Sequence, residues 1–209
     1  FYHFILPTIY GEHEDENRLI PYLLKAIKEG KIDGAGFARP FLADGAWVTK
    51  LKEGKENEIR PCICCHNGCF NMAHWKGHAN VQTLKDSLHM SRCAVNAETM
   101  QSTVHYIKKT NAPKTVAIIG GGIGGMEAAR VLKLRGHNPV IYEKSEKLGG
   151  TFLAASKASF KGKLRELEAW YENQMKKLQI EIHFNNEVKD IHSLKPIPIL
   201  LLQDLSLEF

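Results

Sequence analysis

A short apolar run followed at once by a cluster of glycines most constrains the fold of this chain. Residues 115–119 (TVAII) have the length and composition of a buried parallel strand, and GGGIGGMEAAR follows directly. The glycines fit the pattern G-x-G-x-x-G at Gly120, Gly122 and Gly125, between a predicted strand and a predicted helix. There the first glycine permits a tight turn, the second admits a pyrophosphate, and the third lets helix and strand pack closely. The pattern predicts a Rossmann-like dinucleotide-binding unit; a glycine-rich turn without a ligand is the alternative.

A second strand and a carboxylate follow this turn. The predicted helix ends at Gly136, and a strand predicted over residues 139–142 ends in Glu143. A carboxylate at this place accepts hydrogen bonds from a ribose and would repel a 2′-phosphate. Gly149 and Gly150 come next and allow another close backbone approach, as would suit a flavin dinucleotide.

The C-terminal residues continue this unit only in part. Apolar residues at helical spacing predict a long amphipathic helix over 160–178, and alternating residues predict a third strand over 180–184. After that, Pro196 and Pro198 interrupt the region where the next sheet element should lie. The sequence therefore predicts a nucleotide-binding fold that stops unfinished.

The cysteines are concentrated in one segment and suggest a metal centre. All five lie within residues 61–96: Cys62, Cys64, Cys65, Cys69 and Cys93. The three that form a C-x2-C-x3-C loop are Cys62, Cys65 and Cys69. We expect Asn67 and Gly68 to give this loop positive-φ freedom, and Cys93 could supply a fourth thiolate. Four thiolates in a chain without an export signal favour soft-metal ligation over disulfides, and an iron–sulfur cluster takes such a set.

Two other interpretations of the cysteine segment stay open on spacing alone. Structural zinc binds four-thiolate and mixed Cys/His sites of similar spacing, and the same segment carries four histidines. These are His66, His74, His78 and His89. Alternatively, the cysteines are merely buried thiols. Cys64 falls outside the ligand spacing, and we interpret it as a small apolar wall of the site.

The pattern of the first 55 residues is typical of the end of a β/α barrel. Residues 4–10 and 32–38 have the pattern of strands, with a helical pattern over 19–27 between them. Gly11 and Arg39 follow the two strands, where a barrel carries its active site and often binds a phosphate. Arg39 could bind that phosphate with two donors, unless it is an ordinary surface arginine. We expect Pro40 to discourage helix at Arg39.

Short helices and a linker are predicted between the barrel-like N-terminal residues and the dinucleotide-binding unit. Helical spacing predicts helices over residues 44–54, 81–90 and 98–109, and the last leads to a linker at Pro113. We predict four parts of an α/β chain. These are the C-terminal end of a TIM (β/α)8 barrel over 1–55, an iron–sulfur segment over 56–112, an incomplete Rossmann-like FAD/NAD-binding domain over 113–195, and an aberrant tail over 196–209.

The composition of the chain argues against nucleic acids and membranes as partners. The net charge is +5, with no block of five like charges, which argues against nucleic acid as a partner. No apolar run reaches the roughly 18 residues of a membrane span, and the N-terminus lacks a signal-peptide pattern. We therefore expect a cytoplasmic protein without a membrane partner, and a chain that begins within a larger protein.

Together, three stretches resemble one family, the long, multi-cofactor members of the old yellow enzyme group. The stretches are GFARPFLAD, EIRPCICCHNGC with its later RCAVN, and VAIIGGGIGGMEAARVLKLRGHNPVIYEKSEKLGGTF. The group includes 2,4-dienoyl-CoA reductase, clostridial-type enoate reductases and trimethylamine dehydrogenase. The resemblance covers about residues 5–192, and it favours an iron–sulfur cluster over zinc by analogy.

The resemblance implies a β/α barrel with FMN, a 4Fe–4S cluster at its edge, and a dinucleotide-binding module with FAD. In that family NADH, less often NADPH, reduces FAD, electrons cross the cluster singly, and FMN delivers hydride to an activated C=C bond. By match, Gly11, Ala38 and Arg39 would contact the FMN phosphate. Cys62, Cys65, Cys69 and Cys93 would bind the cluster. Gly120, Gly122, Gly125, Glu143 and Gly150 would hold FAD.

The chain departs from the family pattern in three places. The spacing before Cys93 is longer than the common one, which makes Cys93 the least certain ligand. Glu12 follows Gly11, where a smaller or basic residue is commoner. The barrel strands that carry the proton donor are absent, so no catalytic residue can be named and the fragment alone is expected to be inactive.

The first functional hypothesis is a piece of an NAD(P)H-dependent ene-reductase that acts on a small enoate or enoyl-CoA substrate. The alternatives are an electron-transfer or dinucleotide-binding module without its own substrate chemistry, an amine dehydrogenase of the same family, and a structural zinc protein.

Overall fold

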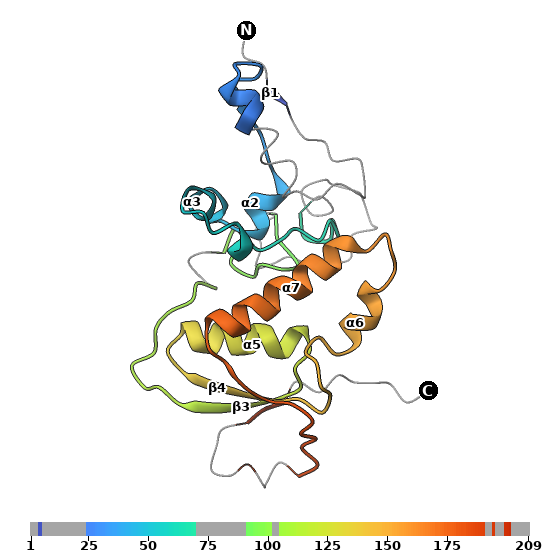
Figure 1. Ribbon diagram of the computed structural model, residues 1–209. Helices are drawn as coiled ribbons and strands as arrows, with labels where there is room; N and C mark the ends of the chain where they lie inside the picture. The colour runs from blue at the N-terminus through green and yellow to red at the C-terminus, as the bar shows by residue number, and fades with distance from the viewer. Residues whose placement is uncertain are drawn as a thin grey trace, which may run out of the picture. The chain divides into compact units, whose positions relative to one another are not determined.

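The computed structural model describes residues 4–5, 24–69, 91–101, 105–190, 194 and 199–201 (Figure 1). The chain divides into two compact units, Phe1–Val104 and His105–Phe209. In the described part of the chain, no helix combines the length and the hydropathy needed to cross a membrane.

A parallel sheet forms the centre of the second unit. Its strands are β3 (Thr115–Ile119), β4 (Asn138–Tyr142), β5 (Glu181–His183) and β6 (Ile199–Leu201). Among the described residues they lie in the order β5-β4-β3-β6, and each neighbouring pair is parallel. Ile118 and Ile141 are completely buried where β3 and β4 pair. The predicted strands over 115–119, 139–142 and 180–184 are therefore confirmed, and the fold is a mixed α/β fold with a parallel sheet.

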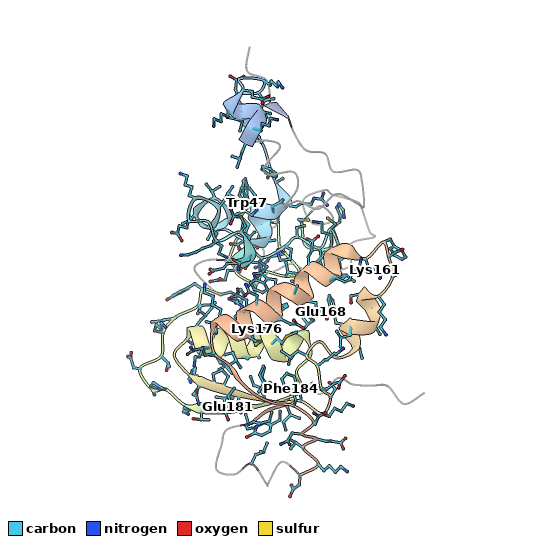
Figure 2. All side chains as sticks on the ribbon, viewed as in Figure 1. Trp47, Lys161, Glu168, Lys176, Glu181 and Phe184 are labelled. Atoms are coloured by element: carbon cyan, nitrogen blue, oxygen red, sulfur yellow. The ribbon has the colours of Figure 1, made fainter. Side chains whose placement is uncertain are left out.

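The described part of this unit has the helices α5 (Ile123–Leu134), α6 (Thr151–Ser156) and α7 (Gly162–Lys177), of which α5 packs on the sheet, α7 on α5 and α6 on α7. Figure 1 shows α5 next to β3 and β4, with α7 packed against α5. Met126 of α5 is fully buried, and Trp170 and Met175 of α7 are almost so. The predicted amphipathic helix is confirmed, while α6 was not predicted. The Ser156 hydroxyl lies 3.2 Å from a carboxylate oxygen of Glu168 (labelled in Figure 2), which joins α6 to α7.

The strand β6 corrects the prediction for the tail. We expected the prolines at 196 and 198 to end the sheet, but Ile199–Leu201 pair in parallel with β3, Ala117 opposite Ile199. A proline removes only its own N–H donor, so the residues that follow it can still join an edge strand. The resulting order is 3-2-1-4 within the unit, that of a doubly wound dinucleotide fold. The other residues of the predicted tail lie outside the described part.

A short parallel strand pair belongs to the first unit. The strand β1 (Phe4–Ile5) pairs with β2 (Gly34–Ala35), and residues 24–28 between them are helical. Ala26 and Ile32 form a small buried core against which Phe37 packs. This is the strand–helix–strand order that the sequence predicts. The strand β2 is shorter than the predicted range 32–38, and residues 6–10 of the other predicted strand lie outside the described part.

The helix α2 (Arg39–Ala43) corrects the prediction for Arg39. We expected Pro40 to exclude helix there, but the helix begins at Arg39, with the proline in its first turn. Proline is tolerated in that turn because those N–H groups have no intrahelical acceptor. The following helix, α3 (Trp47–Lys52), lies within the predicted range 44–54 and precedes the short helix η1 (Glu56–Glu58). Phe37 and Phe41 pack with Trp47, which is labelled in Figure 2, as an aromatic group with ring centroids 5.1–6.1 Å apart.

The helix predicted over residues 98–109 is wrong in the described part of that range. Residues 98–100 form turns, and residues 105–110 are irregular. The Asn96 side chain accepts a hydrogen bond from the Glu98 amide at 3.1 Å, and the Thr99 hydroxyl donates to the Leu42 carbonyl at 2.6 Å. Such side-chain bonds to the backbone compete with helix formation. The helix predicted over 81–90 lies outside the described residues.

Candidate cofactor sites

The glycine turn of the second unit is shaped by its first and last glycines. Gly120 has a φ of 101°, which favours glycine, and its amide donates to the Tyr142 carbonyl at 2.9 Å. A Cβ atom on Gly125 would lie 2.0 Å from the Gly120 carbonyl oxygen. Only glycine at residue 125 therefore lets α5 start this close to β3. Both residues occupy the structural places that the sequence pattern predicts.

The middle glycine leaves an open approach to the start of α5. Gly122 is the N-cap, with φ −68° and ψ −179°, and no side chain caps the helix. A Cβ atom on Gly122 would meet nothing within 4 Å. The first amides of a helix have no intrahelical acceptors and carry a partial positive charge. An anionic group such as a pyrophosphate fits this position, because there is both free space and uncapped donors.

Glu143 lies at the end of β4 beside the glycine turn and is buried. One carboxylate oxygen accepts from the Gly121 amide at 2.6 Å, and the other accepts from the Ser145 amide and hydroxyl at 2.8 and 2.7 Å. Burial alone would raise the pKa of Glu143, but the hydrogen bonds from Ser145 and Gly121 outweigh it, so the pKa lies below its ordinary value. The carboxylate is thus held ionised as a fixed acceptor. Sequence reasoning found Glu143 but missed Ser145 and Gly121.

The second glycine pair is brought against the first glycine turn. Gly149 donates its amide to the Gly121 carbonyl at 2.8 Å, and Gly149 pairs with Gly122 as an isolated parallel bridge. Gly150 has φ 55° and ψ −135° and is the N-cap of α6. A Cβ atom on Gly149 would lie 2.9 Å from the Leu153 side chain. The two predicted backbone approaches, at Gly122 and Gly149, are therefore adjacent in the structure.

In the first unit, four cysteines line one cavity. They are Cys62, Cys65, Cys69 and Cys93, the four that the sequence predicts as ligands. Arg39 and His66 line the same cavity. None of the five cysteines of the chain forms a disulfide. Two segments separated by residues 70–90, which lie outside the described part, thus bring their thiols to one place.

The cysteine thiols are not grouped as ligands of a single ion. Among the described residues, no three His, Cys, Asp or Glu side chains are placed to hold one metal ion. A side-chain hydrogen bond with Cys64 raises the pKa of the Cys62 thiol, and burial raises this pKa further. Burial raises the pKa of the Cys93 thiol. Both thiols are therefore protonated near neutral pH unless a metal displaces the proton.

Three details of this loop differ from prediction. The positive φ angles fall on Cys64 (55°) and His66 (57°), not on Asn67 or Gly68. Gly68 is required for another reason, because a Cβ atom there would lie 2.6 Å from the Arg92 carbonyl oxygen. Cys64 does not line the cavity, so the interpretation of its side chain as a wall is wrong. Its thiol instead lies 4.0 Å from the Cys62 carbonyl oxygen.

The residues predicted for the FMN phosphate are described only in part. Gly11 lies outside the described residues. Ala38 is the residue before α2, and Arg39 is the first of that helix. An Arg39 guanidinium nitrogen lies 2.9 Å from His66 Nε2, on the exposed side of the cysteine loop. The sequence did not predict this contact between the two predicted sites.

Comparison with known proteins adds to these observations. Residues 93–204 match the family model described as pyridine nucleotide-disulphide oxidoreductase. A cinnamate reductase of Clostridium sporogenes is 38% identical over 160 residues, which are 77% of this chain and 22% of that protein. An NADH oxidase of Thermoanaerobacter brockii is 34% identical over 180 residues, 85% of this chain and 26% of that protein. The chain thus spans about a quarter of the length of these relatives.

A solved structure and a dimethylamine dehydrogenase are also similar to this chain. A structure of 2-naphthoyl-CoA reductase with 2-naphthoyl-CoA matches 78% of this chain and 23% of its own, with a TM-score of 0.66 and 30% identity. A dimethylamine dehydrogenase of Hyphomicrobium is 34% identical over 130 residues, 61% of this chain and 16% of that protein.

The parallel sheet, the glycine turn and the family model together assign residues 93–204 to the pyridine nucleotide-disulphide oxidoreductase family. By their names, the relatives of this chain include a cinnamate reductase, an alkene reductase and a dimethylamine dehydrogenase. The chain belongs to the multi-cofactor old yellow enzyme family.

Proposed function

We propose that this chain is part of an NAD(P)H-dependent flavin and iron–sulfur oxidoreductase that reduces an activated C=C bond. The observation that carries the proposal is that the four predicted ligand cysteines, and not Cys64, line one cavity. Residues 1–55 would close a β/α barrel, and residues 113–195 would belong to the FAD/NAD-binding domain. We propose a cytoplasmic location, because thiolates that bind a metal centre rather than form disulfides are typical of a reducing compartment.

The cysteine cavity suits an iron–sulfur cluster better than zinc. The ligands would be Cys62, Cys65, Cys69 and Cys93, a set of four thiolates that such clusters take. A zinc ion draws every sulfur to about 2.3 Å from one atom. A four-iron cluster binds each thiolate through a different iron, so its ligands stand further apart. The resemblance to the old yellow enzyme group favours the cluster over zinc.

The two nucleotide sites would use different parts of the chain. Gly120, Gly122, Gly125, Glu143 and Gly150 would hold FAD, and Gly11, Ala38 and Arg39 would contact the FMN phosphate. The cluster would supply single-electron transfer and the flavins hydride transfer when bound. Glu143 would accept a hydrogen bond from a ribose with the capacity that Gly121 and Ser145 leave on its carboxylate. The same negative charge would repel a 2′-phosphate, a group that FAD lacks.

Replacement of Gly122 by alanine is expected to weaken FAD binding and to leave the stability of the protein almost unchanged. The Gly122 backbone angles suit alanine, and the added Cβ meets no atom of the protein, so stability without FAD should change by less than about 1 kcal/mol. The Cβ would occupy the space proposed for the pyrophosphate, so we expect FAD affinity to fall at least tenfold. Titration calorimetry and thermal unfolding of the FAD-free protein measure the two effects. Unchanged FAD affinity would show that the pyrophosphate does not approach Gly122.

Activity of the full-length protein tests the substrate class. The relatives that reduce C=C bonds support an enoate or an enoyl-CoA ester as the small-molecule substrate. We expect NADH oxidation without oxygen to depend on an added 2-enoate such as cinnamate, with formation of the saturated acid. The amounts of NADH oxidised and of saturated acid formed should be equimolar, since one hydride from NADH reduces one C=C bond. NADH oxidation that no enoate or enoyl thioester stimulates would contradict the ene-reductase proposal.

An amine dehydrogenase is the second candidate. The dimethylamine dehydrogenase relative supports it, because the match covers residues of both units. In that case, a secondary or tertiary amine should bleach the oxidised flavin without NADH. If neither substrate class changes the flavin spectrum while NADH still reduces it, an electron-transfer module is the better description.

A further inference from the structure

The segment that carries Cys93 is attached to the rest of the cysteine site by several hydrogen bonds. The Arg92 amide donates to the Gly68 carbonyl, which places the residue before Cys93 against the first cysteine loop. The Asn96 amide group donates to the Leu42 carbonyl at 3.1 Å. None of these bonds uses a thiol, so this attachment does not depend on a bound metal.

Arg60 makes the contact that joins the two cysteine segments through a buried charged side chain. It stands two residues before Cys62, and its guanidinium donates to the carbonyl of Val95, two residues after Cys93. Arg60 is 7% exposed, unlike most arginines. A single side chain thus connects the residues that flank the first and the last predicted ligands.

The backbone of Arg60 is itself fixed. Its amide donates to an Asp44 carboxylate oxygen at 2.8 Å. The same oxygen accepts from Lys50 Nζ at 2.5 Å, and Lys50 also donates to the Glu58 carbonyl at 3.0 Å. Asp44 is 7% exposed. Arg60 therefore reaches towards Val95 from a position fixed by a buried, charge-assisted network.

We propose that Arg60 is a positioning residue that holds Cys93 in the cysteine cavity before any cluster is bound. Residues 70–92 separate Cys69 from Cys93, and closing so long a connection costs chain entropy. A contact that is already formed without metal offsets part of that cost. Arginine suits the role because its planar group keeps its charge and offers five donors. The role in cluster binding rests on the proposed function, whereas the positioning of the thiol does not.

The test compares Arg60→Gln with Arg60→Lys and two controls in the full-length protein. Ile32→Ala removes buried apolar volume from the first unit without touching either cysteine segment, and Lys52→Gln removes an exposed positive charge from α3. In metal-free protein, the rate at which iodoacetamide alkylates Cys93 is measured by mass spectrometry. The rate for Cys65, which is exposed, serves as the internal reference. Circular dichroism confirms that each variant is folded.

We expect the Cys93 rate, relative to Cys65, to rise at least fivefold in Arg60→Gln and to recover partly in Arg60→Lys. Both controls should stay within twofold of the unmodified protein. In iron-loaded protein, Arg60→Gln should give the electron paramagnetic resonance signature of a three-iron cluster, which forms when one ligand is lost. An unchanged Cys93 rate in Arg60→Gln, or an equal rise in Ile32→Ala, would overturn the proposal. If the unmodified protein binds no iron, the proposed function fails while the alkylation rates still decide the role of Arg60.

Discussion

Replacement of Gly125 by alanine is expected to destabilise the second unit by about 3 kcal/mol, because the added Cβ would lie 2.0 Å from the Gly120 carbonyl oxygen. That oxygen belongs to the backbone at the end of β3 and cannot move without separating the strand from α5. The loss should include the glycine turn itself, so binding of FAD should disappear as well. Chemical denaturation of the FAD-free protein measures the change in the free energy of unfolding.

Gly124→Ala is the matched control for this prediction. Gly124 belongs to the same helix, yet a Cβ there meets nothing within 4 Å. Alanine favours helix over glycine by up to about 1 kcal/mol, so Gly124→Ala should be neutral or slightly stabilising. Equal losses in the two variants would mean that the turn does not have the close packing described for Gly125.

Replacement of Cys93 by serine is expected to remove one ligand of the proposed cluster and to leave at most about three irons per chain. Cys93 is the least certain ligand on spacing, but it lines the same cavity as the other three. The fall should appear in iron and sulfide analysis and in the visible spectrum of the full-length protein. NADH-dependent reduction of FAD should continue, because the dinucleotide residues lie in the other unit.

Cys64→Ser is the control for Cys93→Ser. Cys64 lies between two predicted ligands in sequence but does not line the cavity, so this variant should keep its full iron content. The result that would count against the ligand assignment is loss of iron in Cys64→Ser with retention in Cys93→Ser.

The parts of the fold that sequence reasoning predicted are those set by local patterns. The strands around the glycine turn and the long helix α7 follow from apolar runs and helical spacing, and the structure has them within a few residues. The roles of Gly120 and Gly125 followed from steric rules that apply wherever a strand turns tightly into a helix. These features depend on neighbours in sequence, which is why the sequence alone sufficed.

The predictions were wrong where the structure depends on contacts between distant residues, or on the place of a residue within its helix or strand. Pro40 is compatible with helix only because it falls in the first turn, and the helix predicted after Glu98 yields to bonds from Asn96 and Thr99. The strand Ile199–Leu201 is defined by its pairing with β3, a contact across much of the unit. No local pattern reports such contacts.

The candidate sites also have parts that local patterns predicted and parts that depend on distant contacts. Spacing selected the four cysteines that line the cavity, but it did not reveal Arg60 or the partners of Glu143. Most of these contacts use backbone carbonyls and amides, which occur all along the chain, so the sequence carries no signal for them. A buried arginine can be recognised only once its surroundings are known.

Metal and sulfide analysis of the unmodified full-length protein, purified without oxygen, tests the proposed cluster most directly. We expect about four irons and four acid-labile sulfides per chain, zinc below stoichiometry, and a brown colour that NADH bleaches. Stoichiometric zinc without sulfide, or a colourless protein that binds neither metal, would contradict the assignment of Cys62, Cys65, Cys69 and Cys93 to an iron–sulfur cluster.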